Sequence, residues 1–286
     1  MRLVLFSNAG LRPDSTCLYF VRAFERVLGT GNVWHVQTQE ELQSLKGTEA
    51  DLFLKVDDGQ SWQEWNDKLH PSAYYVIDTH LDPWREDYEN RYNFDSLFFA
   101  QKNALVQRWR CPDRTWLPLG CDPEYHDVGK KPKRYDVCFL GNFHSSYGTE
   151  RLDYVDHLFK NVDVPFYSNY RILQAYTEKM AESKLVLNRS LNKDVNMRFF
   201  EAMCSGSALL TDRIPDQDVL GFKEGVHYIG YDSKEEMVDK AKWYLEHEWN
   251  REQIAIEGQI LARQQHTYTD RVLEMLKVLK QEKVNV

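Results

Sequence analysis

Residues 196–212 have the sequence NMRFFEAMCSGSALLTD, and their pattern predicts a short helix that leads into a buried strand. The helix is expected over Phe199–Cys204, and Gly206 ends it because glycine adopts the left-handed backbone that follows many helices. Ala208–Thr211 and the preceding Leu185–Leu187 are apolar runs of strand length. The order strand, helix, strand is the repeating unit of a parallel α/β sheet.

The same alternation extends from this segment in both directions. Short apolar runs are separated by segments with helical periodicity, which predicts mainly parallel sheets with helices on their faces. Further strands are expected at Leu3–Phe6, Val33–Val36, Asp51–Leu54, Tyr74–Ile77, Leu97–Ala100, Thr115–Leu117, Val137–Leu140 and Pro165–Tyr167. Helices are expected at 18–28, after Asp82-Pro83, at 152–159, at 172–180, and over 234–281 with breaks near 249–250 and 267.

The periodicity lapses between residues 120 and 134, where glycine and proline stand among polar residues. Such a stretch is typical of a linker. We therefore predict an α/β protein with two Rossmann-like, doubly wound domains that face each other across a cleft. The first covers 1–120, the linker 121–134 and the second domain 135–266. Ligands of such sheets bind beyond the carboxyl ends of the strands, so functional side chains are expected in the loops that follow strands.

The composition of the 286-residue chain argues against several classes of protein. A net charge of −8 disfavours a general nucleic-acid coat or a binder of anionic membranes. The five cysteines are scattered and include no CxxC pair, so neither a zinc site nor a disulfide framework is indicated. No stretch approaches the roughly 18 apolar residues of a membrane span. We expect a cytoplasmic protein whose aromatic residues, 13% of the chain, lie mainly in its core.

The start of the 199–204 helix carries the residues of clearest chemical interest. Either Asp194 or Asn196 can cap it and leave its first amides free to meet an anion. Arg198 stands in the first turn, where a cation opposes the helix dipole and a guanidinium suits a phosphate. Glu201, one turn on, can accept hydrogen bonds from two vicinal ribose hydroxyls. The spacing fits equally an exposed Arg198–Glu201 pair on a plain amphipathic helix.

This segment resembles the sugar-nucleotide-binding segment of GT-B glycosyltransferases of the CgeB type, within glycosyl transferases group 1. The matching segments are, in chain order, Leu117–Pro123, Asp136–Asn142, Arg151 and Arg198–Asp212. The resemblance covers most of residues 95–280. It places the helix at 267–286 as the one that crosses back to the N-terminal domain in this fold.

The resemblance implies a metal-independent glycosyltransferase that moves a sugar from a nucleoside-diphosphate sugar to an acceptor hydroxyl. UDP-sugar is the expected donor, no further cofactor is expected, and the acceptor is a glycan, a small molecule, a protein or DNA. By resemblance Glu201 holds the ribose of the donor. The other donor-binding residues that it implies are Arg198, Arg151, Gly141, Asn142, Asn188 and Asn196.

The sequence departs from the family pattern at one acidic position. Many retaining GT-B enzymes have two acids separated by seven residues, whereas Lys193 stands eight positions before Glu201, with Asp194 beside it. Only the second acid is therefore carried over, and inversion versus retention stays open. The missing acid also keeps open a sugar-nucleotide-binding module without turnover.

Asp78, His80 and Asp82 follow a predicted strand and are the candidates for acid–base chemistry. In an extended segment they would share one side, so that His80 takes the proton of the acceptor hydroxyl and Asp78 orients the imidazole. Turn capping by the two acids is the alternative. Lys55 and Asp57, which follow the preceding strand, are further candidates.

Lys130, Lys131, Lys133 and Arg134 form the only dense basic run in the sequence. Such a run is usually a solvated linker. It leaves open a DNA-base glycosyltransferase of phage type, acting on a hydroxylated base, because DNA phosphates bind lysine and arginine.

Overall fold

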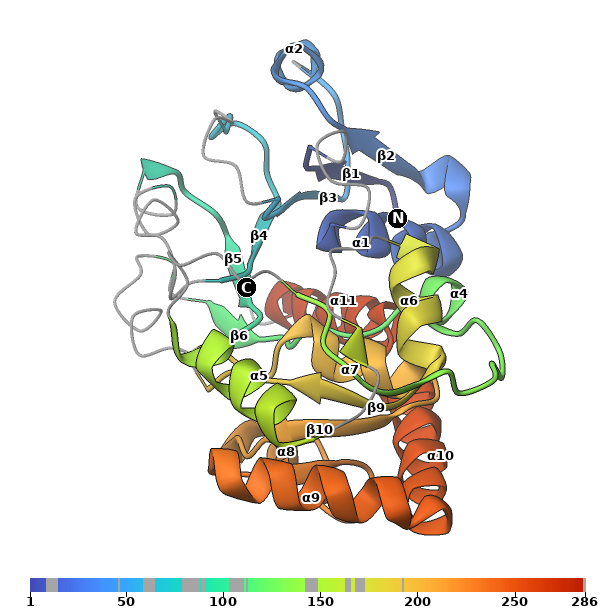
Figure 1. Cartoon of the computed structure of the whole chain (residues 1–286). Helices are drawn as coiled ribbons and strands as arrows, with labels where there is room; N and C mark the ends of the chain where they lie inside the picture. The colour runs from blue at the N-terminus through green and yellow to red at the C-terminus, as the bar shows by residue number, and fades with distance from the viewer. Residues whose placement is uncertain are drawn as a thin grey trace. The chain divides into compact units, whose positions relative to one another are not determined.

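The computed structural model consists of two compact units, each built on one sheet (Figure 1). Unit 1 comprises Met1–Pro118 and Tyr268–Val286, and unit 2 comprises Leu119–Thr267. The structure describes residues 1–8, 15–45, 47–58, 65–78, 88, 91–102, 111, 113–141, 149–162, 166–167, 173–191 and 193–284.

The sheet of unit 1 has six parallel strands. They are β1 (Leu3–Phe6), β2 (Val33–Val36), β3 (Leu52–Val56), β4 (Ser72–Val76), β5 (Ser96–Phe99) and β6 (Arg114–Trp116), in the order β2-β1-β3-β4-β5-β6. The described helices of this unit are α1 (Thr16–Leu28), the 3-10 turn η1 (Thr30–Asn32), α2 (Gln39–Ser44) and α11 (Tyr268–Val284).

Unit 1 buries aromatic side chains on both faces of its sheet, because successive strand residues point to opposite sides. Tyr75 of β4 contacts Phe20 of α1, with ring centroids 4.5 Å apart. Its neighbour Tyr74 stacks on Phe94 on the other face, at 5.2 Å. Phe20 also meets Tyr268 of α11 edge-on, so α1 and α11 cover one face together.

The sheet of unit 2 has five parallel strands. They are β7 (Tyr135–Cys138), β8 (Phe166–Tyr167), β9 (Ser183–Asn188), β10 (Ala208–Asp212) and β11 (Ile229–Tyr231), in the order β11-β10-β9-β7-β8. The described helices are α4 (Pro123–His126), α5 (Thr149–Asn161), α6 (Leu173–Ala181), α7 (Met197–Cys204), α8 (Pro215–Val219), α9 (Lys234–Glu246) and α10 (Glu248–Gln265). Helices α5 and α9 pack together, while α4, α6, α7 and α10 form a second contacting set.

These two all-parallel sheets confirm the predicted pair of Rossmann-like units. In each, the strand order reverses once. The chain leaves β7 for β8 on one side and leaves β9 for β10 on the other, so the carboxyl ends of β7 and β9 flank the reversal point of unit 2. In unit 1 the reversal point lies between β1 and β3. Ligands of open α/β sheets bind at such points.

Several elements differ from the expectation. The stretch 121–134, expected to be a linker, lies within unit 2 and contains α4. This helix begins there because Asp122 caps it and Pro123 occupies its first position. Helices α2 and α8 and the strand β11 were not predicted. The helix expected after Asp82-Pro83 falls outside the described residues.

Candidate functional site

The candidate donor-binding residues gather at the carboxyl ends of β7 and β9 in unit 2. Helix α7 follows β9, and Asn196 caps it: the side-chain oxygen of Asn196 accepts a hydrogen bond from the backbone N–H of Phe199 at 3.3 Å. Of the two residues considered as caps, Asn196 is therefore the one that acts. The amino end of the helix carries a partial positive charge, and Arg198 of its first turn reaches both Asn188 at the end of β9 and Gly141 after β7.

Asn188, the last residue of β9, holds this region together. Its side-chain oxygen accepts hydrogen bonds from Arg198 Nη1 at 3.0 Å and from Asn196 Nδ2 at 3.2 Å. Its amide nitrogen donates to Thr211 Oγ1 of β10 at 3.1 Å. Asn188 is fully buried, so its orientation is fixed by these bonds and fixes in turn the guanidinium of Arg198.

Arg198 passes directly over Gly141, the last described residue after β7 before the gap at 142–148. A Cβ atom at position 141 would collide with Arg198 Nη2. The guanidinium also lies 4.9 Å from the centroid of the Phe139 ring. Its Nε is buried and has no hydrogen-bond partner in the described part of the chain. The group is thus anchored at Nη1 and has unused donor capacity.

Arg151 of α5 brings a second guanidinium to the same region. Its Nε and Nη2 donate to the carbonyl oxygen of Arg189, at 3.2 and 3.0 Å. Burial, and next the nearby charge of Arg198, lower the pKa of Arg151 to about 10. Within the described ranges, neither Arg151 nor Arg198 forms an ion pair with a carboxylate. Two such cations side by side favour an anionic ligand.

Arg189 differs from these two because its charge is compensated. Its Nη1 lies 3.1 Å from Asp212 Oδ2, and its Nη2 pairs with Glu150. Asp212 also accepts a hydrogen bond from the backbone N–H of Ser190 at 2.9 Å. Sequence reasoning did not assign Arg189 or Asp212, although both stand where strands end, which is the signal that would have found them.

Glu201 is buried, with 2% of its surface exposed, and both of its carboxylate oxygens have partners. Tyr176 donates its hydroxyl to Oε2 at 3.0 Å, and His126 Nε2 lies 3.3 Å from Oε1. The charge of Arg198 acts to lower the pKa of Tyr176, so the phenol lies near the guanidinium as well as the acid. Burial, and next the charge of Glu201, raise the pKa of Tyr176 well above its ordinary value. The exposed Arg198–Glu201 pair of a plain surface helix is not formed.

Lys193 and Asp194, the two residues at the position of the missing acid, differ in burial. Lys193 is exposed and has a left-handed backbone, with φ of 52°. Asp194 is buried, and its charge acts to raise the pKa of Arg151, although the burial of Arg151 outweighs it. Asp194 thus contributes negative charge near the guanidinium groups.

In unit 1, the structure describes Asp78 but not His80, and Asn142 of unit 2 also lies outside the described residues. Asp78 has a left-handed backbone, with φ of 52°, and its N–H donates to Gln101 Oε1 at 2.8 Å. The backbone is therefore not extended at Asp78, while His80 and Asp82 lie outside the described residues, so their arrangement with Asp78 stays a prediction.

Lys55 and Asp57 are both buried in unit 1. The Lys55 ammonium lies among the rings of Phe6, Tyr74 and Tyr88, at 5.5, 5.8 and 5.1 Å from their centroids. Burial lowers the pKa of Lys55. Asp57 Oδ2 accepts a hydrogen bond from the N–H of Ile77 at 3.2 Å, which ties the ends of β3 and β4 together.

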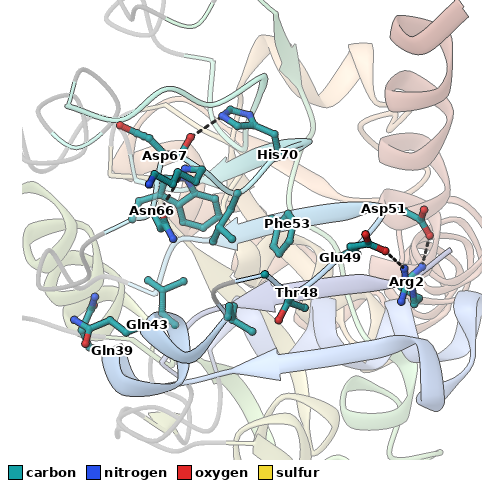
Figure 2. A pocket seen from close by; sticks show the side chains of 17 residues that line it. Arg2, Gln39, Gln43, Thr48, Glu49, Asp51, Phe53, Asn66, Asp67 and His70 are labelled. Carbon is teal, nitrogen blue, oxygen red and sulfur yellow. Dashed lines mark hydrogen bonds and ion pairs between the residues drawn. The ribbon is translucent and has the colours of Figure 1, made fainter.

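A separate cavity of about 1140 Å³ lies in unit 1, and Figure 2 shows the side chains that line it. Its lining includes Arg2, Asp51 and His70, which precede β1, β3 and β4. The cavity therefore lies at the amino ends of these strands, whereas ligands of such sheets bind beyond the carboxyl ends. Of the predicted site residues that the structure describes, none lines it.

The basic run has structural partners within unit 2. Lys133 Nζ donates to the carbonyl of Ala181 at 2.9 Å and to Ser207 Oγ at 2.8 Å, and burial of the ammonium lowers the pKa of Lys133 to about 8. Lys131 pairs with Glu178, and Arg134 with Glu182, each at 3.7 Å. These contacts fasten the segment before β7 to α6.

Comparisons with known structures agree with this architecture. The fold matches a sucrose-phosphate synthase from Thermosynechococcus elongatus with a TM-score of 0.72 at 9% identity, over 100% of both chains. It matches HepE from Anabaena, solved with UDP and glucose, with a TM-score of 0.67 at 14% identity, over 98% of this chain and 100% of that one. An alpha-glucosyltransferase solved with UDP gives a TM-score of 0.70 at 11% identity, over 98% and 100%.

At these identities the likeness establishes the fold, which is GT-B. No curated protein sequence matches the chain. None of the helices in the described ranges is both long enough and apolar enough to cross a membrane. Residues 132–277, half of the chain, match the Glycosyl transferase-like family. The chain belongs to this glycosyl transferase-like family.

Proposed function

We propose that the protein is a metal-independent glycosyltransferase of the CgeB type that transfers a sugar from a nucleoside-diphosphate sugar to an acceptor hydroxyl. The observation that carries this proposal is the pair formed by Arg151 and Arg198. Both guanidinium groups lie at the carboxyl ends of β7 and β9, and neither has a carboxylate partner among the described residues. A diphosphate supplies a direct anionic partner for both guanidinium groups.

The chemistry requires such a place. As the acceptor oxygen attacks the sugar, the bond between the sugar and the diphosphate breaks, and the departing nucleoside diphosphate takes the electron pair. Positive groups held in position before the reaction stabilise that developing charge. Arg198, fixed by Asn188, and the amino end of α7 fulfil this condition without a metal ion.

For the donor we propose a UDP-sugar, with Glu201 accepting hydrogen bonds from the ribose. Two of the similar structures contain UDP, which supports this choice of nucleotide. Glu201 lies one turn along α7 from Arg198, and Tyr176, which donates to Glu201, lies near both side chains. A ribose and its diphosphate are joined covalently, so a neighbouring acid and guanidinium suit both parts of one ligand.

The acceptor hydroxyl needs a base, and we retain His80, oriented by Asp78, as the proposed one. The DNA-base alternative has one supporting observation, since the alpha-glucosyltransferase has also been solved with a 13-mer DNA containing an HMU base. The basic run that suggested DNA, however, contacts α6 through Lys131 and Lys133, and Arg134 pairs with Glu182 just after that helix. We therefore favour a glycan, a small molecule or a protein as acceptor.

A thermal-shift screen against nucleoside diphosphates and their sugars tests the proposal. A ligand present at 100 times its dissociation constant adds about 2.7 kcal/mol to the free energy of unfolding. We expect UDP and one UDP-sugar to stabilise the protein, and the UDP-sugar to be turned over with release of UDP. Retention of the UDP-sugar without release of UDP would instead support a binding module without turnover.

A further inference from the structure

The side chain of His126 is held in one tautomer by its own helix. Asp122 caps α4, and its backbone N–H donates to His126 Nδ1 at 2.9 Å. An imidazole nitrogen that accepts a hydrogen bond carries no proton, so the ring proton of His126 resides on Nε2. His126 is therefore a neutral hydrogen-bond donor with a fixed direction.

That direction is toward Glu201. Nε2 lies 3.3 Å from Glu201 Oε1, and the two side chains are 1% and 3% exposed. The contact joins α4 to α7, two elements that pack against each other. A buried carboxylate needs such donors, because without hydrogen bonds the free energy lost with its hydration is not compensated.

A second donor fixes the rotation of the same carboxylate. Tyr176 of α6 donates to Oε2 at 3.0 Å, so each oxygen is held from a different helix. A carboxylate offers about four acceptor positions, and His126 and Tyr176 take one each. Held at both oxygens, the carboxylate plane cannot turn, and its orientation toward a ligand is set before the ligand binds.

We propose that His126 is a positioning residue for donor binding, which acts by holding Glu201 through Nε2 in the orientation that accepts the ribose hydroxyls. This inference rests on the proposed function, since it assumes that Glu201 contacts the nucleotide. It adds a residue outside the segment 196–212 and assigns a role to the stretch expected to be a linker.

Two variants of His126 separate its two nitrogen atoms. In His126→Asn, the amide oxygen takes the place of Nδ1 and still accepts from the N–H of Asp122, while the donor to Glu201 is lost. In His126→Gln, the amide nitrogen takes the place of Nε2 and still donates to Glu201, while the acceptor for Asp122 is lost. Each variant removes one buried hydrogen bond, so their melting temperatures are expected to fall by similar amounts.

The test is the dissociation constant of UDP, measured by titration calorimetry in both variants. We expect His126→Asn to bind UDP about tenfold more weakly, the effect of losing one buried donor, and His126→Gln to restore most of that loss. Equal affinities in the two variants would show that His126 supports only the fold and would overturn the proposal.

Wild-type protein and Glu201→Gln are measured alongside to separate the two claims. If the wild type binds UDP and Glu201→Gln binds it weakly, the assignment of Glu201 to the donor stands. The comparison of His126→Asn with His126→Gln then tests the role of His126 by itself. If the wild type does not bind UDP, the proposed function itself fails. Should His126→Asn not fold, the ¹⁵N spectrum of histidine-labelled wild type replaces it: UDP is expected to shift the Nε2 resonance of His126, and an unmoved resonance contradicts the proposal.

Discussion

Tyr176 donates its hydroxyl hydrogen to Glu201 Oε2 at 3.0 Å, and the charge of Arg198 acts on the same phenol to lower its pKa. The phenol therefore lies near both the side chain proposed to hold the ribose and the one proposed to hold the diphosphate. Arg198 is held in turn by Asn188, at the end of β9. The proposed donor site thus combines two hydrogen-bonded pairs, Tyr176 with Glu201 and Arg198 with Asn188, and the second pair is anchored in the sheet of unit 2.

Removing this hydroxyl should weaken both the fold and the binding of UDP. Tyr176→Phe leaves a buried carboxylate oxygen without its donor, which costs about 1–3 kcal/mol of unfolding free energy. Urea denaturation measures the stability and calorimetry the affinity. Tyr135→Phe is the matched control, since its hydroxyl contacts Lys179 at the other end of the sheet and its loss should leave UDP affinity unchanged. Equal effects on affinity would refute the role of Tyr176 in UDP binding.

Gly141 should tolerate no side chain while Arg198 keeps its position. In Gly141→Ala the new Cβ collides with Nη2 of Arg198, so the guanidinium must move away from Asn188. We expect UDP affinity to fall about tenfold, equivalent to about 1.4 kcal/mol. Gly31→Ala is the control, because a Cβ there meets nothing within 4 Å. Unchanged UDP binding in Gly141→Ala would show that the position of Arg198 is not needed for the nucleotide.

The pair formed by Arg189 and Asp212 should matter for stability more than any surface pair. Its side chains are 11% and 3% exposed, and removing one partner of a buried pair costs about 3–5 kcal/mol. Asp212→Asn is expected to lower the unfolding free energy by this amount. The carboxylate of Asp232, which pairs with Arg213, is 71% exposed. Asp232→Asn should therefore lower the unfolding free energy by no more than about 1 kcal/mol. Comparable losses in denaturant titrations of the two variants would contradict the role given to Asp212.

Transfer should not depend on a divalent metal ion. The account assigns charge neutralisation to Arg151, Arg198 and the amino end of α7, so protein treated with EDTA is expected to release UDP from a UDP-sugar at its original rate. The measurement compares the initial rates before and after chelation. A rate abolished by EDTA and restored by Mg²⁺ or Mn²⁺ would show that a metal performs this task.

The parts of the fold that could be predicted are those determined by local pattern. β1 and β2 have the predicted bounds because each is a short apolar run bounded by turn residues. β11 was missed because Ile229–Tyr231 is three residues long and contains a glycine. Helix α2 could have been predicted from the sequence, since Thr38 and Glu41 have the spacing of a capping box, which the structure shows at the start of the helix.

The grouping of the candidate residues was predictable where they share one segment. Asn188, Asn196, Arg198 and Glu201 come from a single strand–loop–helix unit, and the structure brings them together. Tyr176 and His126 were missed because they reach Glu201 from α6 and α4. Their positions depend on how these helices pack, and no spacing in the sequence records that.

The most direct test of the account compares UDP with uridine in the wild type and in Arg198→Met. If the guanidinium groups hold the diphosphate, the wild type binds UDP much more tightly than uridine, and Arg198→Met loses most of this difference while its affinity for uridine is retained. Titration calorimetry gives all four dissociation constants. A wild type that binds UDP no more tightly than uridine, or a variant that keeps the full difference, would contradict the central claim.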